Sequence, residues 1–383
     1  MSDRNAFDET LMRRALELAR RGIGHVEPNP AVGAVIADDH GNVLGEGWHE
    51  RFGGPHAEVH AFTSAGQAAR GAILFVTLEP CCHFGKTPPC TQAVIAAGIR
   101  RVVVATTDPA PHSSGRGIEE LKAAGIEVEV GLLGDEARSL IAPFTRLMTT
   151  GLPWMHAKWA MTLDGKIATT TGSSQWITNP SSRAVVHQLR GRMDAILTGV
   201  GTALADDPQL TARPAGPRIA TRIVLDSLCR LSIDSRLVRT AKDVPVLVAT
   251  TEFAPTQRVD ALRHAGVEVL QIAGTTQRHP DPLELARELG RRRMTNVLIE
   301  AGSQVLGSFF DLGLINEVHA FIAPSLIGGR DAPTPIGGAG LENMASAVRL
   351  EQTAFQELDG DFYIHGFTTS PSPRPRLRGR GLG

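Results

Sequence analysis

The segment LEPCCHFGKTPPC, residues 78–90, places three cysteines within ten residues of a chain that has only four. Cysteines gathered in one proline-rich loop are typical of a metal site and not of a disulfide framework. A second segment, GGPHAEVHAF at residues 53–62, carries His56 and Glu58 two positions apart. Both segments lie at turns that lead into predicted helices. We therefore expect these two turns to meet in one α/β domain.

The candidate metal ligands are His56, Cys81 and Cys90. One nitrogen and two thiolates suit tetrahedral zinc, and a catalytic zinc keeps its fourth position for water, which it makes available as hydroxide near neutral pH. Glu58 is not needed as a ligand, so it would move protons between that water, a ring nitrogen and departing ammonia. These residues predict hydrolytic deamination. Cys82 is an alternative thiolate ligand, although adjacent cysteines rarely both face one metal.

Composition restricts the class of protein. The 383 residues are 42% hydrophobic and 21% charged, which fits a globular chain of two domains. The formal net charge of -1 provides no basic field for a nucleic acid, so an acidic ligand must be held by local groups. No signal peptide or long apolar run is present. We expect a cytoplasmic protein with neither nucleic acid nor membrane as a partner.

Periodicity predicts the elements of the first domain, residues 1–150. A helix near 7–19 should precede a hairpin of strands 32–37 and 43–48. Further helices are expected at about 57–69, 89–97, from 117 and from 134, alternating with strands at 73–77, 101–105 and 126–130. This alternation predicts a layered α/β domain whose later strands are mostly parallel. Gly151 and Pro153 mark the boundary.

A second α/β domain is predicted over residues 151–369. Its expected strands are 155–160, 195–199, 222–226, 244–249, 267–271, 296–300, 318–323 and 361–367, with helices at about 180–192, 282–292 and 303–312. Residues 370–383 are rich in Pro, Gly and Arg, so we expect a disordered basic tail. Contact of that tail with RNA or anionic lipid is the alternative.

Three segments of this second domain would place turns at the ends of strands: residues 158–178, 195–213 and 297–310. Backbone N–H groups and a positive helix end at such turns suit phosphate. Gly199 and Gly201 do not complete a dinucleotide fingerprint, because Leu204 stands where a third glycine is required. From the residues alone, nucleotide binding and ordinary tight turns remain equally open.

The first domain resembles the cytidine-deaminase superfamily, whose zinc nucleobase deaminases carry H-x-E followed by P-C-x-x-C. Here eight residues, not two, separate Cys81 from Cys90. EPNPAVGAVI, GEGWHERFGGPHAE, TLEPCCHFGKTPPC and TDPAP, in this order, resemble the deaminase half of the bifunctional riboflavin-biosynthesis deaminase/reductase family. The resemblance implies substrate binding by Asn29, His49 and Lys86, with His83 lining the pocket. A turn around Asn29 and a strand end at His49 are the alternatives.

The second domain resembles the reductase half of the same family, which has a dihydrofolate-reductase-like fold and uses NADPH. The resemblance implies that the NADPH site contains Ala160, Trp176, Thr202, Asp206, Ser227, Gly302, Ser303, Gly307 and Ser308. It implies that the substrate site contains Ser174, Arg190, Leu210, Arg213 and Glu300. The two arginines suit a phosphate, because a planar guanidinium makes bidentate contacts. Helix capping for Asp206 and core packing for Trp176 are the alternatives.

Together these features predict an α/β chain with a cytidine-deaminase-like three-layer domain followed by a dihydrofolate-reductase-like domain. The expected activities are zinc-dependent deamination of a diaminohydroxy-phosphoribosylamino-pyrimidine and NADPH-dependent reduction of its ribosyl side chain to ribityl. The substrates would be small pyrimidine ribose phosphates, and we expect a homo-oligomer, a dimer or tetramer. No protein acid for the reduction is evident. A nucleic-acid base deaminase and an inactive regulator are the competing hypotheses.

Overall fold

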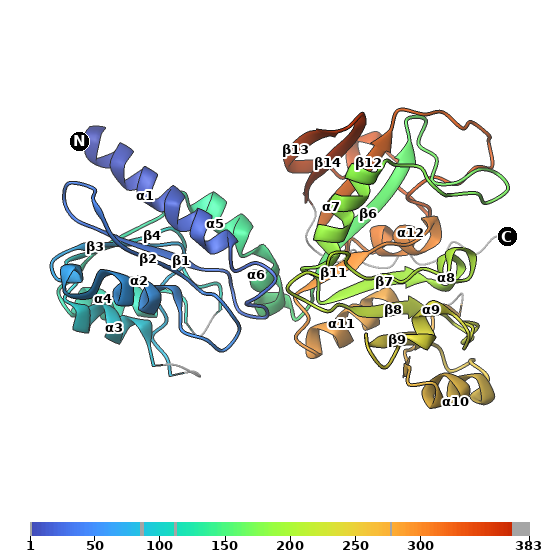
Figure 1. Ribbon diagram of the computed structural model, residues 1–383, viewed down its shortest axis with the longest axis horizontal. Coiled ribbons are helices and arrows are strands. Elements are labelled where there is room, and N and C mark those ends of the chain that lie inside the picture. Colours follow the sequence, from blue (N-terminus) through green and yellow to red (C-terminus); the bar gives the residue numbers. More distant parts are fainter. Residues whose placement is uncertain (1, 85–87, 111–112, 276–277, 370–383) are drawn as a thin grey trace. The chain divides into compact units, whose positions relative to one another are not determined.

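The computed structural model divides into two compact units between Leu152 and Pro153 (Figure 1). It describes residues 2–84, 88–110, 113–275 and 278–369. Lys86 and the tail predicted at 370–383 lie outside the described residues. Every helix in these described ranges is too short or too polar to cross a membrane.

The first unit is built on a five-stranded sheet. Its strands are β1 (Gly33–Ala37), β2 (Val43–Trp48), β3 (Ile73–Val76), β4 (Arg101–Val104) and β5 (Glu127–Val130). Their order is β2-β1-β3-β4-β5, with β1 antiparallel to β2 and β3, whereas β3, β4 and β5 are parallel. The structure therefore confirms both the predicted hairpin and the predicted parallel strands.

Helices cover both faces of this sheet. On one face, residues of α1 (Ser2–Arg20) and α5 (Gly134–Leu140) share a buried apolar cluster with alternate residues of β1, β3 and β4. On the other face, a second cluster joins the sheet to α2 (Ala57–Ala65), α3 (Cys90–Ala97) and α4 (Arg116–Ala123). A 3₁₀ turn, η1 (Gly66–Ala69), follows α2, and α6 (Ala142–Thr150) ends the unit. The result is the predicted three-layer domain.

Two glycines of β2 allow α2 to lie directly on the strand. A Cβ at Gly47 would come within 2.4 Å of the Ala57 carbonyl oxygen and 2.5 Å of the Ala61 nitrogen. A Cβ at Gly45 would come within 2.4 Å of the same Ala61 residue's carbonyl oxygen. Since backbone atoms cannot yield as side chains do, only hydrogen fits at these positions. The close contact fixes the start of α2, where His56 and Glu58 lie.

The second unit contains a nine-stranded sheet in the order β10-β9-β8-β7-β11-β6-β12-β14-β13. The strands are β6 (Trp154–Thr162), β7 (Ala195–Gly199), β8 (Thr221–Leu225), β9 (Val246–Thr250), β10 (Glu268–Gln271), β11 (Asn296–Ile299), β12 (Glu317–Ala323), β13 (Leu350–Leu358) and β14 (Asp361–Thr368). All strands from β10 to β12 are parallel to their neighbours, and β13 and β14 are antiparallel.

The helices of this unit are α7 (Pro180–Arg190), α8 (Val200–Asp206), α9 (Arg236–Arg239), α10 (Thr256–His264), α11 (Pro282–Arg291) and α12 (Ser303–Asp311), and a short 3₁₀ turn, η2, spans Met344–Ser346. The sequence predicted α7, α11 and α12 but not α8, α9, α10 or β13. Helices α8 and α9 are only seven and four residues long. Strand β13 is an edge strand with mostly exposed residues, so it lacks the apolar alternation that reveals a half-buried strand.

Replacing Gly47 with alanine is expected to lower the free energy of unfolding of the first unit by about 2–3 kcal/mol, because the new methyl group overlaps backbone atoms of α2. Denaturant unfolding measures the change. The control is Val43→Ala on the exposed end of the same strand, where the cost should stay within about 0.5 kcal/mol. Equal losses in the two variants would contradict the close-contact explanation.

Candidate active sites

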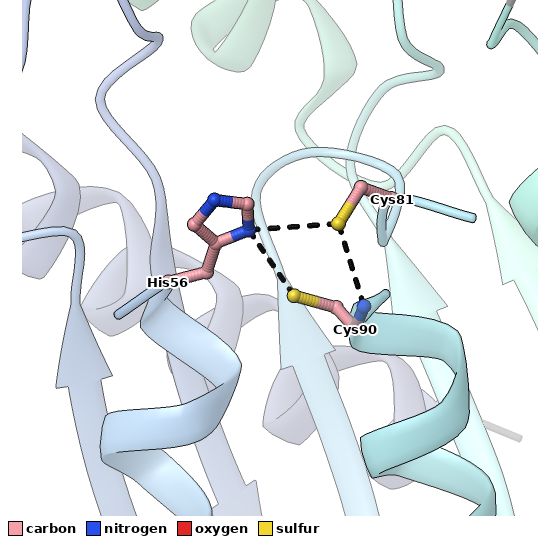
Figure 2. Close-up of side chains that lie close together, drawn as sticks. All are labelled: His56, Cys81 and Cys90. Carbon is pink, nitrogen blue, oxygen red and sulfur yellow. Dashed lines mark hydrogen bonds between the residues drawn. The ribbon is translucent and has the colours of Figure 1, made fainter. Parts of the chain in front are cut away.

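Three side chains from separate segments meet in the first unit. The His56 Nδ1 atom lies 3.2 Å from the Cys90 sulfur and 3.6 Å from the Cys81 sulfur (Figure 2). Ligand atoms of a tetrahedral zinc lie about 3.5 Å apart, because Zn–N and Zn–S bonds are about 2.0 and 2.3 Å long. The three donors therefore fit a zinc ion. Cys82 is half-buried and does not belong to this group.

Two helix starts position these ligands. His56 is the N-cap residue of α2, and Cys90 is the first residue of α3. Cys81 lies in the loop between β3 and α3, where its sulfur accepts a hydrogen bond from the Cys90 backbone N–H at 3.4 Å. The positive end of a helix dipole favours a thiolate at such a position. The loop that separates the two cysteines thus returns the chain to the same point in space.

The electrostatic surroundings favour an anionic sulfur. Hydrogen bonds from Cys90 and His56 lower the pKa of the Cys81 thiol, whereas the same contact with Cys81 and burial raise the pKa of the Cys90 thiol. Cys81 is therefore the more readily ionised of the two sulfurs, and a thiolate is the form that ligates zinc. In contrast, burial raises the pKa of the Cys82 thiol. The two adjacent cysteines thus differ in chemistry as well as in position.

Glu58 is buried beside the ligands. It lies in the first turn of α2, only 3% exposed, and its carboxyl group is in hydrogen-bonding contact with the Cys90 thiol. Burial raises its pKa above the ordinary value for glutamate. A buried carboxyl group next to a ligand, but not among the three grouped donors, is placed to carry protons.

The predicted pyrimidine-binding residues Asn29 and His49 lie against the same site. The Asn29 Nδ2 atom is 3.3 Å from His49 Nε2, and His49 Nδ1 is 2.9 Å from the Pro55 carbonyl oxygen. His49 therefore donates through Nδ1 and accepts through Nε2. Its ring packs edge-on against that of His56, with centroids 5.4 Å apart. Burial lowers the pKa of His49, which keeps its imidazole neutral.

His83, the other residue predicted to line the pocket, lies close to Ser113. Its Nδ1 atom is 3.4 Å from the Ser113 hydroxyl.

Glu79 is a residue of this site that the sequence reasoning missed. Its buried carboxylate accepts backbone N–H groups of Asp108 and Gly115 through one oxygen, and of Gly117 and Ile118 through the other. These four bonds, of 2.9–3.3 Å, tie the loop after β4 and the start of α4 to the segment that carries Cys81. The signal in the sequence was the place of Glu79 in LEPCC, two residues before Cys81.

In the second unit, Arg190 and Glu300 are brought together. The guanidinium donates to both carboxylate oxygens, at 2.6 and 2.9 Å, and Lys158 Nζ lies 3.5 Å from one of them. Burial would raise the pKa of Glu300, but the charges of Arg190 and Lys158 lower it to about 2. The sequence analysis expected Arg190 to bind a phosphate. The structure instead gives its bidentate contact to Glu300, and it adds Lys158, which the sequence did not single out.

The other predicted substrate residues differ in their exposure. Arg213 is exposed and donates to Gln209 and Thr211. Partial burial and the neighbouring charges of Arg190 and Arg236 lower its pKa, so an anion would relieve repulsion here. The Leu210 side chain, in contrast, is buried in the main apolar cluster. Ser174 donates to Asp206 at 3.4 Å, which joins a predicted substrate residue to a predicted cofactor residue.

Two helix starts lie in the part of the second unit where the sequence predicts the NADPH site. Helix α8 follows β7, and α12 follows its parallel neighbour β11. Gly302 caps α12 without any side-chain hydrogen bond to the first turn. A Cβ at Gly302 would meet only the Thr202 hydroxyl, at 3.8 Å, and one at Gly201 would meet nothing within 4 Å. Other atoms therefore do not crowd these two glycines, and a helix start without a capping side chain suits a phosphate.

The remaining predicted cofactor residues have local roles in the structure. Ser308 donates to the Val305 carbonyl oxygen, and a Cβ at Gly307 would lie 2.4 Å from the backbone of Gly337. Ala160 lies on β6, and Ser227 follows β8. Trp176 is 72% exposed, and the Arg183 guanidinium stacks on its ring. Ser303 opens α12. Their contacts with NADPH stay predictions.

Known families match both units. Residues 5–106 match the cytidine and deoxycytidylate deaminase zinc-binding region, and residues 153–364 match the RibD C-terminal domain. The riboflavin biosynthesis protein RibD of Actinobacillus pleuropneumoniae is 41% identical over 95% of this chain and 96% of its own length. The chain belongs to the RibD family. RibD of Escherichia coli is 40% identical, over 94% of this chain and 98% of its own.

Solved RibD structures share the fold. RibD of Acinetobacter baumannii superposes with a TM-score of 0.81 at 37% identity, and it covers 95% of this chain and 99% of its own. The diaminohydroxyphosphoribosylaminopyrimidine deaminase/5-amino-6-(5-phosphoribosylamino)uracil reductase of Thermotoga maritima gives the same TM-score, identity and coverage. Membership of the RibD family confirms the predicted fold class, zinc and NADPH as cofactors, and the pairing of a deaminase with a reductase.

Replacing Glu79 with glutamine is expected to lower the free energy of unfolding by about 2–3 kcal/mol, because an amide NH₂ would face backbone N–H donors. Looser anchoring of the Cys81 segment should also speed zinc loss to a chelator. Thermal unfolding and metal analysis test both effects. Glu119→Gln, an exposed change on α4, is the matched control. Wild-type stability in Glu79→Gln would refute the anchoring role.

Proposed function

We propose that this RibD-family chain deaminates a diaminohydroxy-phosphoribosylamino-pyrimidine at the site around Glu58 and reduces the ribosyl side chain of the product at the site around Glu300. The observation that carries the first assignment is the convergence of His56, Cys81 and Cys90 beside a buried carboxyl group. A zinc ion held by these ligands would supply a water molecule activated as a nucleophile near neutral pH.

Side chains of the first unit handle the substrate and its protons. Glu58 takes the proton of the attacking water and returns protons to the ring nitrogen and to the leaving ammonia, because its buried carboxyl group adjoins the candidate ligands, whereas the Glu79 carboxylate is occupied by four backbone N–H groups. The Asn29 amide, held by His49, presents its oxygen to an amino or N–H group of the pyrimidine. The neutral His49 ring keeps this edge of the pocket uncharged.

Side chains of the second unit hold the sugar and its phosphate. NADPH would supply the hydride. Glu300, kept ionised by Arg190, accepts hydroxyl groups of the open-chain sugar, and the Lys158 ammonium beside it donates the proton that the reduced carbonyl or imine requires. Arg213 is exposed at the entrance of this group and binds the terminal phosphate, where an anion offsets its repulsion with Arg190.

A homo-oligomer, either a dimer or a tetramer, stays a prediction, and so does a cytoplasmic location. The proposed ligands are small molecules, and nucleic acid is not among them. Substitutions of Glu58 and Arg213 test the proposed roles separately in each unit.

Replacing Glu58 with glutamine is expected to reduce ammonia release by a factor of about 10²–10⁴, the usual contribution of a positioned acid–base group. Zinc content should stay at the wild-type level, because His56, Cys81 and Cys90 are untouched. Ammonia production, metal analysis and NADPH consumption on the deaminated substrate give three separate readouts. Ser64→Ala, exposed on the same helix, is the control. Loss of zinc together with activity would instead make Glu58 a ligand.

Replacing Arg213 with alanine is expected to raise the KM for the phosphorylated substrate of the reductase about 10–100-fold, which corresponds to loss of a charged hydrogen bond. The same variant should treat the dephosphorylated substrate as the wild-type protein does. NADPH absorbance follows both reactions. Arg239→Ala, an exposed arginine of the same unit, serves as the control. An equal rise in KM for both substrates would show that Arg213 does not bind the phosphate.

A further inference from the structure

A second group of possible metal ligands is buried in the second unit, away from the residues assigned above. His156 lies on β6, and Glu317 and His319 lie on β12. Glu317 is directly opposite His156 in the parallel pair. The three residues are only 4%, 9% and 1% exposed. Two histidines and a glutamate in the interior of a sheet face require partners, and none of them serves the proposed reduction.

The donor atoms of the three side chains lie at nearly equal distances. His156 Nδ1 is 3.2 Å from one Glu317 oxygen and 3.3 Å from His319 Nε2, and the other Glu317 oxygen is 3.3 Å from His319 Nε2. A tetrahedral zinc with bonds of about 2.0–2.1 Å to nitrogen and oxygen separates its ligands by about 3.3–3.4 Å. The three donors thus match one face of such a tetrahedron.

The outward-facing atoms of each residue are also bonded. His156 Nε2 lies 3.1 Å from Asn296 Oδ1, and His319 Nδ1 lies 2.8 Å from the Tyr363 hydroxyl. The Trp154 indole N–H donates at 3.0 Å to Glu317, to the same carboxylate oxygen that faces His156. Metal-ligating histidines usually donate their second N–H to such an acceptor, which fixes the tautomer and the ring orientation. His156 has this pattern with Asn296, and His319 has it when the Tyr363 hydroxyl accepts.

The contact with Asn296 directs a lone pair of His156 toward the other two side chains. Because Asn296 Oδ1 only accepts, His156 Nε2 carries its proton, and the neutral ring presents a lone pair at Nδ1. That lone pair faces the Glu317 carboxylate and the second imidazole at van der Waals distance. A metal ion at this point would be bound by both imidazoles and by the carboxylate.

We propose that His156, Glu317 and His319 bind a divalent transition-metal ion, with Zn²⁺ the expected one. Two imidazoles and one carboxylate suit zinc, and the near-tetrahedral separations favour it over the octahedral Mg²⁺ or the larger Ca²⁺. A further imidazole, His365, lies opposite His319 in the β12–β14 pair, and its buried Nδ1 has no hydrogen-bond partner within the described ranges.

The role of this ion is structural. The ligands lie near the amino ends of β6 and β12, whereas the predicted substrate and NADPH residues gather at the carboxyl ends of the parallel strands. The ion joins β6 to β12 and, through Tyr363, to β14. It also fixes β6 two residues before Lys158. Loss of the ion is therefore expected to lower the stability of the second unit and not to affect ammonia release.

Metal content of the full-length chain tests the proposal. Protein produced with added zinc and treated with a weak chelator should hold two zinc ions per chain. Cys81→Ser/Cys90→Ser should hold one, His319→Gln one, and the three substitutions together none. His264→Gln, an exposed histidine of the same unit, should keep two. One ion in wild type and none in Cys81→Ser/Cys90→Ser would overturn the proposal and leave hydrogen bonds among the three side chains as the explanation.

A second measurement does not depend on folding of the His319 variant. Cobalt(II) added to Cys81→Ser/Cys90→Ser, in which the buried cluster is intact, should give visible bands of a four-coordinate ion without a sulfur charge-transfer band, and should raise the Tm. Absence of both changes would overturn the proposal. An ion that persists when His319→Gln is added would also overturn it, because the metal would then lie elsewhere.

Discussion

The first unit depends on one constraint, which is that a histidine at the start of α2 and two sulfurs around the start of α3 must converge within 4 Å. Each neighbouring contact serves that convergence. Glycines of β2 let α2 lie on the strand, and four backbone N–H groups on the Glu79 carboxylate hold the Cys81 segment in place. The helix dipoles and the donated hydrogen bonds then stabilise a thiolate. The sheet, the loops and the local electrostatics of this unit therefore all favour the binding of one cation at this point.

Much of this organisation could be predicted from the sequence. Apolar runs fully covered by helices, such as GAVIA of β1, identify central strands, and both helices that carry ligands begin at proline-containing turns. The candidate metal ligands were identifiable because three donors of two types, one imidazole nitrogen and two thiols, stand beside such turns. Edge strand β13 escaped prediction because its exposed residues obey no burial pattern. Periodicity detects elements through burial, so it detects weakly buried elements poorly.

The partners of charged residues could not be predicted in the same way. The sequence shows that Arg190 is cationic, but only the fold shows that Glu300, 110 residues later, occupies its guanidinium. Lys158 had no motif of its own, and its importance comes from register, since β6 and β11 are adjacent parallel strands. The same holds for His156 and Glu317, which are unremarkable in sequence and are opposite one another in the sheet. Long-range pairing is a property of topology.

The missing side chain at Gly47 has a consequence for how this sequence can change over generations. The residue has no side chain, yet any replacement would displace the helix that carries Glu58, the proposed proton carrier. Selection for ammonia release would therefore act on the Gly47 codon as it acts on the codons of the ligands. Exposed positions on β13, in contrast, are open to drift. Selection for catalysis would thus constrain a residue that does not contact a substrate.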